Sequence, residues 1–177
     1  EIINNWPCVC FHMTDVPFGR GGSPLQNLII RGINKTKVSA LQMTKQLDAG
    51  PVYLKHSLDL NGSAEDIFRE LAVTVSNMIS EIITTSPIPV KQSGDIVCFE
   101  RRSPEQSEIP SDLSPEKLYD FIRMLDAPSY PKAFIIQGGN KLEFSNAKLE
   151  NDSLTAKVTI KTETAKTLAA SQSHKSK

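Results

Sequence analysis

A long amphipathic segment between Ser63 and Ser86 restricts the possible folds more than any other part of the chain. Apolar side chains recur in it every three or four positions, as on a helix with one buried face. They are Ile67, Leu71, Val75, Met78, Ile79 and Ile82. Ser63 followed by Asp66 is typical of a helix start, and Ser86-Pro87 is typical of a helix end. We therefore expect a long helix that covers one face of a sheet.

Short strand-like runs on both sides of this segment would supply the sheet. They lie at residues 8–11, about 37–43, about 52–58 and about 96–99. Between the first two runs, Ser23-Pro24 predicts a further helix, with Ser23 as its cap and Gln26 closing a capping box. Gly32 is expected to end that helix. Strands that alternate with helices indicate an α/β fold for the first part of the chain.

The second part of the chain shows a different pattern. Ser114-Pro115 predicts another amphipathic helix. Its inward residues are expected to be Leu118, Phe121, Ile122 and Leu125. Three alternating runs follow, at residues 133–137, 141–147 and 154–160. The dipeptides Gly138-Gly139 and Asn151-Asp152 between these runs suit tight hairpins, so a small β domain is predicted.

These patterns divide the chain into four predicted regions. They are an α/β domain over residues 1–100, a linker and helix over 101–130, the beginning of a small β domain over 131–161, and a disordered tail over 162–177. The sequence starts with Glu1 rather than methionine and runs almost at once into a strand. We therefore expect it to be a cut through a larger fold, with a part missing upstream.

Charge and cysteine content exclude some classes of protein. The chain has 20 Lys and Arg residues and 20 Asp and Glu residues, so it lacks the net positive field that concentrates a nucleic acid. Its cysteines are Cys8, Cys10 and Cys98, an odd number without an apolar signal segment, which favours a reducing cytoplasm over a disulfide framework. No apolar run approaches the roughly 20 residues needed to cross a bilayer, so no membrane association is expected.

His12 stands at the end of the first apolar run, and its residue type leaves three interpretations open. Cys8, Cys10 and His12 alternate and would share one face of a strand, but neighbours on one face converge poorly on a tetrahedral ion, and we predict no metal site. A nucleophilic pair of Cys10 with His12 has no support from the flanking residues. A packed core histidine is the third interpretation. Cys8 and Cys98 are expected to be core residues.

Four sequence blocks together decide between these interpretations. The first block corresponds to a family pattern made of an N-x-H-x-S-L-L-P strand end, a basic-glycine stretch and a P-x-Q helix start. In this sequence it reads Cys10-Phe11-His12-Met13-Thr14-Asp15-Val16-Pro17, followed by Arg20-Gly21-Gly22-Ser23-Pro24-Leu25-Gln26. The other blocks are Leu47-Asp48-Ala49-Gly50-Pro51, Phe99 to Glu105, and Pro131-Lys132-Ala133-Phe134. In this order they resemble the formyltransferases that use 10-formyltetrahydrofolate, including methionyl-tRNA formyltransferase and the amino-sugar N-formyltransferases.

The resemblance implies a fold and a site. The fold would be the C-terminal part of a Rossmann-like formyltransferase domain, followed by a small β-rich, OB-like domain. His12 and Asp48 match catalytic positions of the family, with His12 moving a proton and Asp48 fixing its tautomer and favouring its charged form. Gln42, Leu47 and Asp48 match the loop that contacts the folate donor, 10-formyltetrahydrofolate.

Cys10 departs from the family pattern, which has an asparagine there whose amide donates to the formyl oxygen. A thiol is a weak donor. Either Thr14, Asn5 or a backbone N–H replaces the amide, or the activity is reduced. Cys10 is therefore a third candidate catalytic residue, and simple packing is its alternative role.

The function implied is cytoplasmic transfer of a formyl group to a primary amine. The acceptor would be methionyl-tRNA or a nucleotide-linked amino sugar, and the zero net charge favours the sugar. Arg101-Arg102 could contact an acceptor phosphate or form a solvated charge pair. The alternative is a degenerate relative that folds and binds a partner without catalysis, as the loss of the amide at Cys10 would allow.

Overall fold

The computed structural model describes residues 2–128, 130–151 and 153–162, and it has the mixed α/β composition that the sequence predicts. The chain divides into two compact units, Glu1–Arg102 and Ser103–Lys177. The sequence placed this boundary at residue 100. The tail predicted over 162–177 lies outside the described residues apart from Thr162, which ends a strand.

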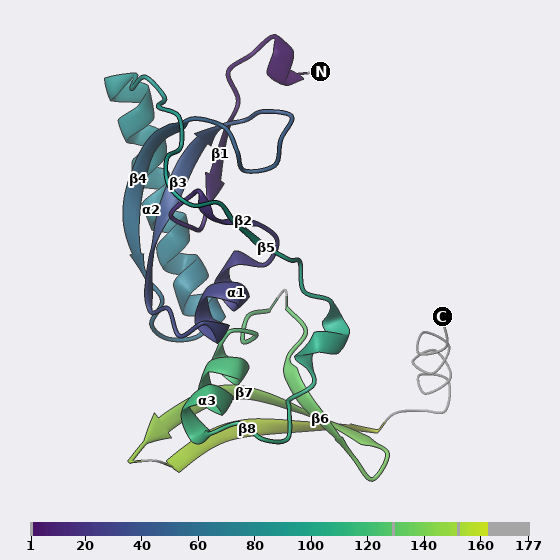
Figure 1. Ribbon diagram of the computed structural model, residues 1–177. Coiled ribbons are helices and arrows are strands. Elements are labelled where there is room, and N and C mark those ends of the chain that lie inside the picture. The colour runs from purple at the N-terminus through teal and green to yellow at the C-terminus, as the bar shows by residue number, and fades with distance from the viewer. Residues whose placement is uncertain (1, 129, 152, 163–177) are drawn as a thin grey trace, which may run out of the picture. The chain divides into compact units, whose positions relative to one another are not determined.

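The first unit is built around a three-stranded antiparallel sheet (Figure 1). Its strand order is β1-β3-β4, with β1 at Val9–His12, β3 at Lys35–Gln42 and β4 at Val52–Asp59. The register places His12 opposite Ser39. The sheet therefore brings the end of β1 alongside the middle of β3.

Two shorter strands form a separate parallel pair beside this sheet. They are β2, Phe18–Gly21, and β5, Val97–Phe99. Side chains alternate along a strand, and Phe99 points into the core with 4% exposure. Cys98 therefore points the other way and is exposed, so the prediction that it lies in the core is wrong.

The long helix α2 spans Ala64–Thr85, as the sequence predicts, and packs against β3 and β4 (Figure 1). Ser63 and Asp66 exchange the two hydrogen bonds of a capping box. Met78 is fully buried, whereas Ile79 is 43% exposed, so the prediction that Ile79 faces inward is wrong. One residue step turns a helix by about 100°, and α2 directs Met78 to the sheet, which leaves Ile79 at the edge of the buried face.

The short helix α1, Pro24–Ile30, starts differently from the prediction. Ser23 has a left-handed φ of 49°, and its side chain makes no cap hydrogen bond. Its hydroxyl instead accepts from the N–H of Arg102 at 2.9 Å. Gly32, with a φ of 72°, follows the helix end as expected.

The second unit holds α3, Pro115–Arg123, against an antiparallel sheet of β6, β7 and β8. These strands span Ala133–Gln137, Asn140–Glu150 and Ser153–Thr162. The Gly138-Gly139 hairpin forms as predicted, whereas Asp152 lies outside the described residues. An irregularity in the pairing between Ser145 and Lys148 lets β7 continue beyond its predicted end.

The core of each unit is made of apolar side chains with almost no exposure. In the first unit it includes Val16, Leu25, Leu28, Ile29, Leu41, Leu58, Leu60 and Ile67. In the second unit it includes Phe121, Ile122, Met124 and Leu125, while Leu118 is only half-buried. Among the described residues no helix combines the length and the apolar character that a membrane span requires.

Candidate functional site

His12 lies at the end of β1 with 8% of its surface exposed. Its Nε2 is 2.7 Å from the carbonyl oxygen of Gly19. Since a carbonyl oxygen can only accept a hydrogen bond, Nε2 carries the hydrogen. In the neutral ring, Nδ1 is then the nitrogen with a free lone pair, and it is the atom able to take up a proton.

Asp48 faces this basic nitrogen from the loop between β3 and β4. Its Oδ2 lies 3.6 Å from Nδ1 of His12, and the two side chains are 12% and 10% exposed. The same oxygen accepts from the N–H of Gly21 at 2.9 Å. The structure thus brings the two predicted residues together at ion-pair distance, and Gly19 rather than Asp48 fixes the tautomer.

The loop that carries Asp48 is held by Gln92, a residue that the sequence did not single out. Its Nε2 donates to the carbonyl oxygens of Asp48 and Gly50, both at 2.8 Å. Asp48 itself has a left-handed φ of 50°. No motif marks Gln92, because its role depends on a fold that places residues 48 and 92 side by side.

Gly50 permits the close approach on which this loop depends. A Cβ at Gly50 would lie 1.8 Å from the carbonyl oxygen of Gln42, which no real contact allows. We expect Gly50→Ala to lower the free energy of unfolding by about 3 kcal/mol, because the loop must move away from β3. Urea unfolding of both proteins measures the loss. Gly32→Ala is the comparison variant: its added Cβ would meet nothing within 4 Å, and it should lose only about 1 kcal/mol, from the left-handed φ of 72° at that position. Equal losses in the two variants would contradict the packing argument.

Thr14 also binds the Gly19 carbonyl and is not free to donate to a substrate. Its hydroxyl donates to that oxygen at 3.2 Å, and its side chain is fully buried. Its own carbonyl accepts from the hydroxyl of Ser39 at 2.7 Å. Of the donors proposed to replace the family asparagine, Thr14 is therefore excluded by its position.

Comparison with solved structures identifies the family of the chain. The chain is 52% identical to a methionyl-tRNA formyltransferase from Clostridium thermocellum, with a TM-score of 0.88, over 92% of this chain and 72% of that one. The chain belongs to the formyltransferase family. The sequence resemblance to this family is thereby confirmed.

A curated relative and a family model agree with this assignment, and a further solved structure shares the fold. The methionyl-tRNA formyltransferase of Mesoplasma florum is 30% identical over 154 residues, which are 82% of this chain and 48% of that protein. Residues 104–161 match the family described as methionyl-tRNA formyltransferase, C-terminal domain. HypX from Aquifex aeolicus in complex with tetrahydrofolic acid shares the fold at 16% identity, with a TM-score of 0.65, over 83% of this chain and 27% of that one. The chain spans about half the length of the curated relatives it matches.

Cys10, for which the sequence resemblance predicts an asparagine, is half-buried and lies on β1 two residues before His12. Burial raises the pKa of its thiol, and the charge of Asp48 raises it further. The thiol therefore stays protonated at neutral pH. A protonated thiol is a poor nucleophile and a weak hydrogen-bond donor, which disfavours the nucleophilic pair of Cys10 and His12.

Gln42 and Leu47, the other predicted site residues, lie at the two ends of the loop that leads to Asp48. Gln42 ends β3, is half-buried and pairs with Val9. Leu47 directly precedes Asp48 and is 71% exposed. The loop thus presents one apolar side chain beside the carboxylate.

Asp15 stands where the family pattern has an apolar residue, and two lysines hold it. Lys55 donates to Oδ1 of Asp15 at 2.5 Å and to the carbonyl oxygen of Val16 at 2.6 Å. Lys37 lies 3.0 Å from Oδ2 of Asp15. These contacts fix the segment between His12 and Gly19. Desolvation pushes the pKa of Asp15 upward, but the hydrogen bonds from Lys55 and Lys37 outweigh it and hold that pKa below its usual value.

This shift predicts a pH dependence of stability. A carboxyl whose pKa is lower in the folded state stabilises the fold above its unfolded pKa, about 3.9, and this contribution is lost as pH falls through the folded pKa. We expect Asp15→Asn to lower the free energy of unfolding by about 1 kcal/mol at pH 7, a modest value because the carboxyl is 42% exposed. Urea unfolding should show the difference shrinking below pH 4. A difference that is the same at pH 3 and pH 7 would contradict the ion-pair origin.

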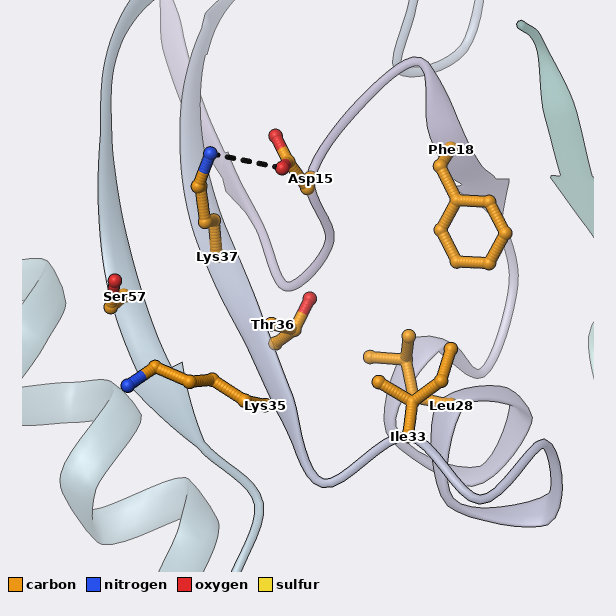
Figure 2. A pocket seen from close by; sticks show the side chains of 8 residues that line it. All are labelled: Asp15, Phe18, Leu28, Ile33, Lys35, Thr36, Lys37 and Ser57. Carbon is orange, nitrogen blue, oxygen red and sulfur yellow. Dashed lines mark ion pairs between the residues drawn. The ribbon is translucent and has the colours of Figure 1, made fainter.

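The described residues also hold a hollow of about 300 Å³ away from these groups (Figure 2). Its lining is Asp15, Phe18, Leu28, Ile33, Lys35, Thr36, Lys37 and Ser57. Leu28 and Ile33 form an apolar end, and the Lys37–Asp15 ion pair lies at another side (Figure 2). None of the predicted site residues lines it. Within the described residues no group of three or more His, Cys, Asp or Glu side chains could hold a metal ion.

Proposed function

We propose that this chain carries the proton-transfer site of an N-formyltransferase that uses 10-formyltetrahydrofolate and a primary amine. The observation that carries the proposal is the placement of Asp48 Oδ2 at 3.6 Å from the basic nitrogen of His12, while Gly19 holds the other ring nitrogen at 2.7 Å. A base of fixed tautomer beside a carboxylate is the arrangement that proton transfer from an amine requires.

His12 would act first as a base and then as an acid. The donor supplies a formyl carbon bonded to a nitrogen that becomes the leaving group. As the amine nitrogen forms its bond to that carbon, Nδ1 of His12 takes the amine proton, and Asp48 stabilises the resulting imidazolium. His12 then gives the proton to the leaving nitrogen as the old carbon–nitrogen bond breaks. The products are an N-formyl amine and tetrahydrofolate, and His12 returns to its neutral form.

Cys10 would face the formyl oxygen in place of the family amide. Its protonated thiol can donate one weak hydrogen bond. Removal of one strong donor from an oxyanion site in other enzymes costs roughly 3 to 4 kcal/mol of barrier. We therefore expect slow turnover relative to family members that keep the asparagine.

The loop of residues 43–47 fits a flat, polar ring system such as that of the folate donor. Leu47 offers an exposed apolar surface directly beside Asp48. Thr44 to Leu47 donate no backbone hydrogen bond to any other described residue, so their N–H groups are free to bind ring atoms. Gln42, at the base of the loop, would border the same site.

The acceptor would be a primary amine on methionyl-tRNA or on a nucleotide-linked amino sugar. The matches to methionyl-tRNA formyltransferases support the first. The balanced charge of the chain supports the second. Free cysteines at positions 8, 10 and 98 fit a reducing compartment, and we place the activity in the cytoplasm.

A formylation assay tests the proposal. The full-length protein is incubated with 10-formyltetrahydrofolate and either methionyl-tRNA or a nucleotide amino sugar, and tetrahydrofolate release is followed. We expect turnover with one acceptor and none with the other. Absence of turnover with both, together with absence of folate binding by calorimetry, would reject the proposal. That result would favour the non-catalytic alternative, which the replacement of asparagine by Cys10 supports.

A further inference from the structure

Arg20 is a buried cation that the proposed chemistry does not use. Its residue surface is 9% exposed, and it lies on β2 opposite Cys98. Its Nε and Nη2 donate to one oxygen, Oε1 of Gln92, at 3.1 and 2.7 Å. Within the described part of the chain Nη1 has no hydrogen-bond partner, and it is not sealed from solvent. One edge of the guanidinium is therefore fixed by the protein, and Nη1 remains available.

The charge of Arg20 has no counter-ion among the described residues. Arg123, which is buried to a similar degree at 8% exposure, is paired with Asp120 at 2.7 Å. Arg20 contacts only the neutral amide of Gln92. A largely buried charge without an opposite charge beside it is unfavourable, so an anion at this position would stabilise the guanidinium.

Gln92 cannot supply the missing charge, because its amide nitrogen has another task. That nitrogen donates to the carbonyl oxygens of Asp48 and Gly50. A glutamate there would set a carboxylate oxygen against two carbonyl oxygens. The loop that holds Asp48 therefore requires the neutral amide of Gln92. A negative charge to pair with Arg20 must come from a bound ligand.

We propose that Arg20 binds an oxyanion of a substrate, a carboxylate or a phosphate, beside the Asp48 loop. Gln92 orients the guanidinium in advance, and Nη1 can donate to an oxygen of either group. The neighbouring residue, Gly21, donates to Asp48 Oδ2, so this subsite adjoins the carboxylate of the proton-transfer site. Assignment of the anion to a substrate rests on the proposed function, whereas the binding of an anion does not.

Further positive charge lies just beyond the adjacent strand. After β5 ends at Phe99, one acidic residue, Glu100, precedes Arg101 and Arg102. A Cβ on Gly22 would lie 2.6 Å from the Cα of Arg101, so the chain at Arg101 runs tightly against the end of β2. The backbone thus places Arg101 and Arg102 next to β2, the strand that carries Arg20.

Titration of the ¹⁵N-labelled full-length protein at low ionic strength tests the binding step without any turnover. The probes are inorganic pyrophosphate for the phosphate source and glutarate for the carboxylate source, with chloride as the ionic-strength control. We expect saturable shifts of the Arg20 Nε–H and Gln92 side-chain amide signals with one of the two oxyanions, and at least tenfold weaker binding in Arg20→Lys. Arg31→Lys, at an exposed arginine that packs on Phe99, should bind like the wild type.

Kinetics with Arg20→Lys then identify the source of the anion. A tenfold rise in KM for the folate donor alone assigns the subsite to a carboxylate of the donor, and a rise for the acceptor alone assigns it to an acceptor phosphate. The proposal is overturned if neither oxyanion shifts the wild-type signals, or if Arg31→Lys weakens binding as much as Arg20→Lys does. Because the titration needs no catalysis, this outcome is separate from a failure of the formylation assay.

Discussion

Replacement of His12 by glutamine is expected to lower kcat for formyl transfer at least a hundredfold. The amide nitrogen of glutamine can still donate to the Gly19 carbonyl, as Nε2 of His12 does at 2.7 Å. It has no atom that can take up a proton, so the loss isolates the base function that general acid–base catalysis requires. Steady-state rates with the accepted amine measure the effect.

The control for this experiment is stability. Thermal unfolding of His12→Gln should lie within a few degrees of the wild type, because the hydrogen bond to Gly19 is kept. Turnover close to normal would remove His12 from the mechanism. A rate loss accompanied by a large fall in melting temperature would instead show that the ring acts by packing.

Replacement of Cys10 by asparagine should raise kcat, by about a hundredfold. The substitution supplies an amide donor at the position where the sequence resemblance predicts one, and a donor of this kind is worth a factor of about 100 to 1,000 in other enzymes. The pKa of the thiol is raised by burial and by Asp48, so the wild-type side chain is a neutral, weak donor. The same rate assay measures the gain.

Two further substitutions at this position separate the possible outcomes. Cys10→Ser supplies a hydroxyl donor of similar size and should give a smaller gain than asparagine. Cys10→Ala removes the weak donor and should change kcat by less than fivefold. A large loss in Cys10→Ala with no gain in Cys10→Asn would show that the thiol itself takes part in the reaction.

The elements that were predicted well are those specified by local sequence. The start of α2 follows from Ser63 and Asp66, which interact with each other and with their own backbone. The hairpin at Gly138-Gly139 needs only two residues with positive φ. Ser23 has the same local signal as Ser63, but the hydroxyl of Ser23 is taken by Arg102, far along the chain. Competition from a distant group explains that difference.

The site was predicted in part for the same reason. His12 and Asp48 were found from their motifs, and the structure brings them to 3.6 Å. The residues that position His12 and Asp48 depend on strand register and loop contacts, and these cannot be predicted from a single sequence. The Gly19 carbonyl accepts from His12, Gln92 anchors the Asp48 loop, and Asp15 fixes the connecting turn. No sequence motif marks any of these three residues as a support for the site.

The rate of formyl transfer by Asp48→Asn is the most direct test of the pairing between His12 and Asp48. Asparagine can still accept from the Gly21 N–H, which Asp48 binds at 2.9 Å, so the loop should keep its place. Only the negative charge that faces Nδ1 of His12 is lost. We predict that kcat/KM falls at least a hundredfold. A kcat/KM within threefold of the wild type would contradict the account.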